Sequence, residues 1–322
     1  MPELHISRSH VVKTDPTTAF NVVKDFSTWK TWSPWLLAEP DCKIDVESPA
    51  DDVGCGYEWD GKVVGAGKMK NTQLTPPSEG QPGVVLQDLT FLRPMRSNAK
   101  IRFDLQPVQE DGEDATRIIW TMDSSIPFFI FWMKPMIQSL VGMDYKRGLS
   151  MLGEWLETGS IAAKTTMNGI DTLPAMRLAT LPGETTFDEI GADMDETISR
   201  VTEKLQAAEI EPSGTWASLY HDANLTTGVV RYSVGMVMPE DQAVPDHLIE
   251  SQVESSEALH VTQQGAYEHI GNGWFCAHQH LQNNRELKRK ANSRRPGVEI
   301  YENSPKDTPR EELLTQIFIP VK

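Results

Sequence analysis

The chain has 322 residues, which is longer than one hydrophobic core usually organises, so two domains are expected. Its 46 acidic and 30 basic residues give a net charge of −16, and such a field repels nucleic-acid phosphates and anionic lipid. The expected partner is therefore a hydrophobic or cationic small molecule, with no nucleic acid and no membrane.

The cysteines and the apolar runs indicate the cellular compartment of the protein. Cys42, Cys55 and Cys276 are an odd number without the spacing of a disulfide framework, and no secretory signal follows Met1, so a reducing cytoplasm is expected. The longest apolar run, Ile126 to Leu140, is interrupted by Lys134 and Pro135 and is too short to span a bilayer. We expect a buried helical segment there.

Residues 1–160 are predicted to form the first domain. A strand over residues 5–13 is followed by Asp15-Pro16, a helix cap and a first-turn proline. Three tryptophans then come close together and must bury their rings. Six strand-like runs follow between residues 43 and 124, separated by turn residues. A long helix is predicted from Phe128 to Thr158, with a kink at Pro135.

The strings FNVVKDFSTWKTWSPW and DYKRGLSMLGEWLE within this half resemble the START-like polyketide cyclase superfamily, often called SRPBCC. The resemblance implies a helix-grip fold with a deep apolar cavity. It implies no particular chemistry and no catalytic residue, because this fold carries many functions. The candidate strands also hold Trp59, Phe91, Phe103 and Trp120, which either line a cavity or belong to an ordinary core.

Residues 158–166 read as a short linker, and residues 168–322 as a second domain that repeats itself. Tyr220 and Tyr301 each precede a proline, Pro239 and Pro320, by 19 residues. Each half is predicted to run strand, helix, strand, strand, with helices over residues 187–208 and 273–291. The fold class expected for the whole chain is α+β: a helix-grip domain followed by this duplicated unit.

The strand predicted at residues 298–301 holds the main candidate site residue. Alternation places Glu299 and Tyr301 on one face of this strand, and that face is either exposed to solvent or turned into a ligand cavity. On the residues alone, an exposed carboxylate is the simpler reading.

The strings GAYEHIGNGW, VEIYENSP and ELLTQIFIPV resemble the GyrI-like effector-binding domain, the ligand module of multidrug-sensing transcription regulators. The resemblance covers Met167 to Lys322. It implies an aromatic-lined cleft for lipophilic, often cationic compounds, with the key acid at Glu299 and with Tyr301 and Trp274 at neighbouring aromatic positions. Tyr220, the counterpart of Tyr301 in the repeat, is the fourth candidate ligand-binding residue. The chain departs from the family at Gln316, where a glutamate is common, so a role for a second carboxylate there is doubtful. No basic recognition helix is present, which argues against DNA binding.

Two further patterns suggest sites of chemistry. Cys276 and His280 share a helix face, but no second cluster with ligand spacing appears, so no metal site is expected. His221-Asp222 is either an acid–base pair or an exposed histidine beside a turn residue. No cofactor motif is present.

The favoured function is a binding or sensing protein for hydrophobic, cationic molecules. The alternatives are a hydrolase of reactive xenobiotics that uses Glu299 and Tyr301, and an interaction scaffold.

Overall fold

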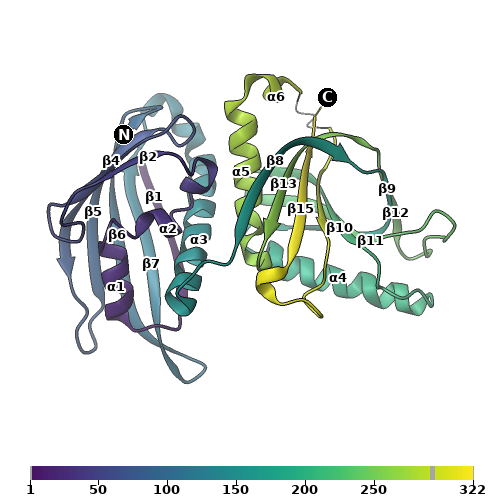
Figure 1. Ribbon diagram of the computed structural model, residues 1–322, viewed down its shortest axis with the longest axis horizontal. Helices are drawn as coiled ribbons and strands as arrows, with labels where there is room; N and C mark the ends of the chain where they lie inside the picture. Colours follow the sequence, from purple (N-terminus) through teal and green to yellow (C-terminus); the bar gives the residue numbers. More distant parts are fainter. Residues whose placement is uncertain (1, 291–293, 322) are drawn as a thin grey trace. The chain divides into compact units, whose positions relative to one another are not determined.

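The computed structural model describes residues 2–290 and 294–321. The chain divides into two compact units, Met1–Ile161 and Ala162–Lys322, and each is built on its own antiparallel sheet (Figure 1). Two sheets with few helices make the chain an α+β protein, so the predicted fold class is confirmed.

The first unit contains a seven-stranded sheet in the order β1-β7-β6-β5-β4-β3-β2. Apart from β1, its strands follow one another as a meander because turn residues separate them; Asp111 and Gly112, for example, both adopt positive φ between β6 and β7. The strands are β1 (Glu3–Val12), β2 (Lys43–Val46), β3 (Gly56–Asp60), β4 (Ala66–Thr75), β5 (Gly83–Arg93), β6 (Ser97–Glu110) and β7 (Glu113–Ser125). The six predicted strands are therefore confirmed.

Short helices connect β1 to β2. Helix α1 (Pro16–Lys24) begins after Asp15, whose carboxylate accepts hydrogen bonds from the amides of Thr17 and Thr18, both at 2.9 Å. Helix α2 (Trp29–Trp32) and the 3₁₀ turn η1 (Leu36–Ala38) follow. As predicted, the closely spaced tryptophans are buried: Trp29 and Trp32 completely and Trp35 in part.

The long C-terminal helix of this unit differs from the prediction. A 3₁₀ segment, η2 (Phe128–Met133), precedes helix α3 (Lys134–Thr158), and Pro135 stands in the first turn of α3. Proline fits a first turn because its missing N–H would have no helical partner there, so Pro135 starts the helix and does not kink it. The predicted burial of the apolar run was also wrong, since four aromatic side chains of η2 are exposed.

Aromatic rings fill the space between α3 and the sheet where the family resemblance implied a cavity. Trp120 of β7 stacks on Tyr145 of α3 with ring centroids 3.9 Å apart, and Phe103 of β6 stacks on Trp120 at 4.9 Å. Trp29 and Trp32 close this stack from α2. Packed side chains therefore occupy the space between α3 and the sheet around these rings, so Phe103 and Trp120 are core residues and do not line a cavity.

The second unit contains an eight-stranded sheet in the order β12-β9-β11-β10-β14-β15-β13-β8. Along the chain, β9, α4, β10 and β11 form one run of strand, helix, strand, strand, and β13, α5, β14 and β15 form another. The strands are β8 (Lys164–Leu173), β9 (Met176–Thr186), β10 (Trp216–Asn224), β11 (Val229–Val237), β12 (Ile249–Val253), β13 (Ser256–Gln264), β14 (Gly297–Tyr301) and β15 (Leu314–Pro320).

Two helices cover one face of this sheet and leave its middle between them (Figure 1). Helix α4 (Ile190–Ala207) packs on β9 and β11, whereas α5 (Ile270–Asn283) packs on β13, β8 and β15. The helix predicted over residues 273–291 in fact begins earlier and is interrupted at Asn284, whose backbone is extended, before the short helix α6 (Arg285–Lys290). The predicted end at Ala291 lies outside the described residues.

Candidate functional site

Glu299 lies at the centre of the second sheet. Its strand, β14, pairs with β10 on one side and β15 on the other, and Glu299 is paired with Ser218 of β10. Its side chain points to the helix-covered face between α4 and α5, where only 1% of the residue is exposed. The alternation predicted from the sequence is thus confirmed, and the side chain of Glu299 points to the protein interior.

Three neutral donors hold the Glu299 carboxylate. The indole Nε1 of Trp274, on α5, donates to Oε1 at 2.5 Å. The hydroxyls of Tyr301 and Tyr220 donate to Oε2 at 2.7 and 3.0 Å. The structure therefore brings together all four residues that the sequence singled out, although they come from three separate elements.

A second layer of side chains orients these donors. The hydroxyl of Ser218 lies 2.8 Å from that of Tyr301 and donates to the sulfur of Met194, on α4, at 3.5 Å. Tyr267 packs against the Tyr301 ring with centroids 5.5 Å apart. The rings of Tyr220, Trp274, Tyr267 and Tyr301 are only half-buried, so an aromatic wall with solvent-reaching edges surrounds a buried acid.

Sequence reasoning missed Ser218 and Tyr267, although a signal for each was present. The repeat that aligns Tyr220 with Tyr301 also places Ser218 over Glu299, two residues earlier in each half. Tyr267 stands within the string GAYEHIGNGW, which carries the family resemblance.

Among the side chains that the structure describes, those of residues 2–288 and 294–321, no basic group pairs with Glu299. Burial raises the pKa of this carboxyl above its ordinary value, while the hydrogen bonds from Trp274, Tyr301 and Tyr220 act in the opposite direction. Burial and the nearby Glu299 charge also raise the pKa of Tyr220 and Tyr301 well above the usual range, and that of Tyr267 to about 12. The three phenols are therefore protonated donors at neutral pH.

A glycine allows Trp274 to approach the carboxylate. A Cβ at Gly297, two residues before Glu299, would lie 2.5 Å from the far edge of the Trp274 ring. The ring also packs edge-on against Tyr220, with centroids 5.1 Å apart, and stacks on His278. Trp274 is thus fixed by contacts on several sides, with its N–H directed at Glu299.

Gln316 lies on the other face of the sheet. It pairs in register with Ile300, the neighbour of Glu299, so its side chain points away from the site. There its amide oxygen accepts hydrogen bonds at 2.8 Å from His260 and at 2.7 Å from Thr262. In this structure, a carboxylate at position 316 would not share a site with Glu299.

The remaining sequence candidates form no site. No cluster of metal-ligating side chains occurs among the described residues, and Cys276 is a buried cysteine outside any disulfide. His221 bonds to Ser233 at 2.8 Å, whereas Asp222 pairs with Arg231 at 3.4 Å, so the two neighbours are not an acid–base pair.

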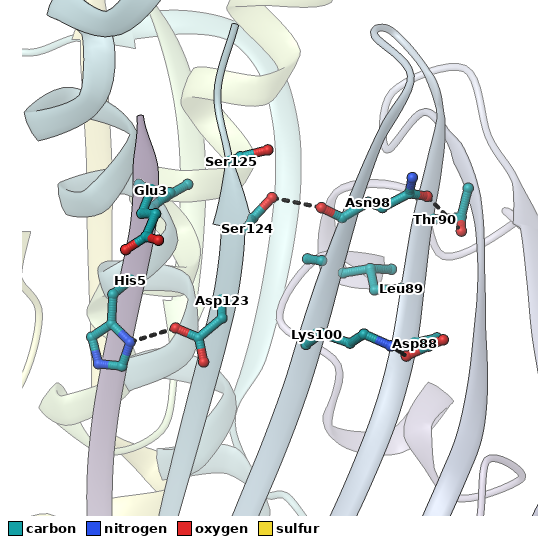
Figure 2. A pocket seen from close by; sticks show the side chains of 12 residues that line it. Glu3, His5, Asp88, Leu89, Thr90, Asn98, Lys100, Asp123, Ser124 and Ser125 are labelled. Carbon is teal, nitrogen blue, oxygen red and sulfur yellow. Dashed lines mark hydrogen bonds and ion pairs between the residues drawn. The ribbon is translucent and has the colours of Figure 1, made fainter. Parts of the chain in front are cut away.

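A hollow in the first unit lies apart from these residues. It opens on the sheet across β1, β7, β6 and β5 (Figure 2). Four of the five titratable side chains lining it form two pairs, His5 with Asp123 at 2.6 Å and Lys100 with Asp88 at 2.5 Å, and Glu3 is the fifth. Because the charges of both pairs are mutually satisfied at an open surface, we place the candidate site at Glu299 and not here.

Comparison with protein families agrees with this division. Residues 169–322 match the model of the GyrI-like small molecule binding domain. Residues 3–157 match the model of the family described as polyketide cyclase / dehydrase and lipid transport. The chain is a fusion of these two families. The GyrI-like unit, which contains Glu299, is thus a small-molecule-binding domain by family.

Solved structures match about half of the chain at low identity. The EcmrR C-terminal domain is 15% identical, with a TM-score of 0.36, and the match covers 50% of this chain and 98% of that one. SAV2435 bound to tetraphenylphosphonium is 16% identical, with a TM-score of 0.37 and coverages of 49% and 94%. The Aha1 dimer from Colwellia psychrerythraea is 16% identical, with a TM-score of 0.33 and coverages of 48% and 98%. No curated protein matches.

Proposed function

We propose that the GyrI-like unit binds hydrophobic cations and that Glu299 is the group that selects their charge. The observation that carries the proposal is a fully buried carboxylate whose described partners are all neutral donors. An ionised acid at such a position costs free energy that an incoming positive charge offsets. A neutral guest would not provide this compensation.

The aromatic wall supports the same ligand class. Tyr220, Trp274 and Tyr301 surround the carboxylate with ring faces and edges. A cation over such rings gains about 0.5–2 kcal/mol from each well-placed face, and their apolar surface suits a lipophilic body. The solved structure of SAV2435 contains tetraphenylphosphonium, a lipophilic cation that provides a practical probe for this chain.

The hydrolase alternative needs Glu299 or Tyr301 to exchange a proton with water or substrate. Both carboxylate oxygens already accept hydrogen bonds, and the raised pKa of the Tyr301 phenol makes it a poor base at neutral pH. This arrangement favours binding over catalysis. Turnover of reactive electrophiles by the wild-type protein, lost in Glu299→Gln, would reverse that preference.

The proposal is tested by calorimetric titration with tetraphenylphosphonium. Glu299→Gln removes the charge and keeps the shape, so its affinity should be at least about tenfold lower than that of the wild type. Glu203→Gln removes an equal charge from the exposed surface of α4 and should leave the affinity unchanged. Equal affinities of the wild type and Glu299→Gln would refute the role of this acid.

A further inference from the structure

The 3₁₀ segment η2 presents an unusual amount of aromatic surface to solvent. Phe128 is 74% exposed, Phe129 75%, Phe131 54% and Trp132 66%. We call these four residues the aromatic ridge. Large aromatic side chains are normally buried, and a contiguous exposed group of them marks an interaction surface.

The geometry of η2 keeps the ridge on the outside. The segment is not one regular 3₁₀ helix, because Ile130 leaves the helical region (φ −122°, ψ 18°) between its two turns. The rings of Phe128 and Phe131 are stacked, with centroids 5.6 Å apart. Just before the ridge, Ile126 is buried and its amide donates to the carbonyl of Pro2 at 3.1 Å, which ties the segment to β1.

More apolar and basic side chains lie at this end of the first sheet. Strand β7 ends beside β6, where Ser124 donates to the carbonyl of Asn98 at 2.7 Å, next to the turn between β5 and β6. The end of β5 exposes Leu92, and the turn exposes Met95 and Arg96. Lys134, which is half-buried, comes two residues after Trp132. Arg96 and Lys134 thus place two basic groups at this end of the sheet, where β1 also places Glu3 opposite Ser125.

The area of the ridge discriminates between possible occupants. Four aromatic side chains exposed to this degree offer roughly 400–600 Å². A stable protein interface needs about 800 Å² on each partner, so the ridge alone is too small for a lasting dimer. A bilayer surface has no such minimum, because aromatic rings insert individually at the boundary between headgroups and acyl chains.

We propose that the aromatic ridge docks the first unit on a phospholipid surface. Phe128, Phe129, Phe131 and Trp132 enter the interfacial layer, while Arg96 and Lys134 lie at the level of the headgroup phosphates. Among the described residues no helix is both long and apolar enough to span a bilayer. The net charge of −16 argues against strongly anionic lipid, so the surface is a zwitterionic one, and the proposal departs in this respect from the expectation of no membrane partner.

The test is co-sedimentation of the full-length protein with sucrose-loaded phosphatidylcholine vesicles. The wild type should partition to the vesicles, and Phe129→Ser/Trp132→Ser should partition at least about tenfold more weakly. Val53→Ser is the matched control, because Val53 is 60% exposed in the same unit but lies outside the ridge. A wild type that stays in the supernatant, or a double variant that sediments equally, overturns the proposal.

Two further measurements separate lipid contact from other causes. Dibrominated phosphatidylcholine should quench part of the wild-type tryptophan fluorescence, and Trp132→Phe should still bind while losing that quenching. Unchanged quenching in Trp132→Phe contradicts insertion of the ridge. A wild-type dimer in gel filtration that the double variant abolishes would assign the ridge to a second copy of the chain and also overturn the proposal.

Discussion

At the scale of single residues, the site depends on which way one strand faces. Alternation in VEIY predicted that Glu299 and Tyr301 share a face, and the 2.7 Å hydrogen bond between them confirms it. The same alternation fits an exposed face equally well, so the pattern alone could not decide burial. What decides it is α5, which brings Trp274 over the carboxylate from 25 residues away in the chain.

The raised pKa of Glu299 predicts how cation binding depends on pH. Protonation removes the charge, so affinity for tetraphenylphosphonium should be full above the folded-state pKa and fall as pH drops through it. Because burial raises that pKa above 4.5, the fall should begin at a higher pH than for an exposed glutamate. Calorimetry across pH 4–8 measures this.

The contribution of Glu299 to folding stability depends on pH in the opposite direction to its contribution to cation affinity. The folded state holds the Glu299 proton more tightly than the unfolded chain, so the residue's contribution to the free energy of unfolding is full below about pH 4.5 and is lost as pH rises through the folded-state pKa.

In Glu299→Gln the cation affinity should be low and independent of pH over this range. A wild-type affinity that stays flat with pH would show that no carboxylate of shifted pKa takes part in binding.

At the scale of elements, the strands were predictable and the helix ends were not. Turn residues such as Asp111-Gly112 mark strand boundaries locally, so the meander of the first unit could be predicted from the sequence. Pro135 was ambiguous, because a proline fits both a kink and a first turn. The exposure of η2 was unpredictable from apolar composition, which indicates burial wherever it occurs.

A mostly buried ion pair within α3 holds the segment Pro34-Trp35 against this helix. Arg147 of α3 donates to Asp144 at 2.5 Å and to the carbonyl of Pro34 at 3.2 Å, and Trp35 donates to the same carboxylate at 2.9 Å. Arg147→Ala leaves Asp144 without its cation in a mostly buried position. The free energy of unfolding should fall by about 2–4 kcal/mol.

The matched control for this variant is Lys100→Ala, whose exposed pair with Asp88 should contribute about 0–1 kcal/mol. Urea unfolding followed by near-ultraviolet circular dichroism of the buried tryptophans measures both variants. If Arg147→Ala is no less stable than Lys100→Ala, the ion pair of Asp144 and Arg147 does not stabilise the packing of Pro34 and Trp35 on α3.

At the scale of the whole molecule, the sequence predicted two units and their families, and the two compact units agree with that division. The first unit keeps the fold but fills the expected cavity with Trp120, Tyr145 and their neighbours. Such filling depends on which rings meet across long sequence separations, and local patterns do not carry that information. The placement of the candidate site in the second unit rests on the buried acid and its neutral donors.

The most direct test of that placement compares a cation with a neutral molecule of similar size in the intact protein. Methyltriphenylphosphonium and triphenylphosphine oxide share three phenyl rings on phosphorus and differ in charge. We predict that the wild type binds the cation at least about tenfold more tightly and that this preference disappears in Glu299→Gln. Equal affinities of the wild-type protein for the two compounds would contradict a charge-selecting role for the buried acid.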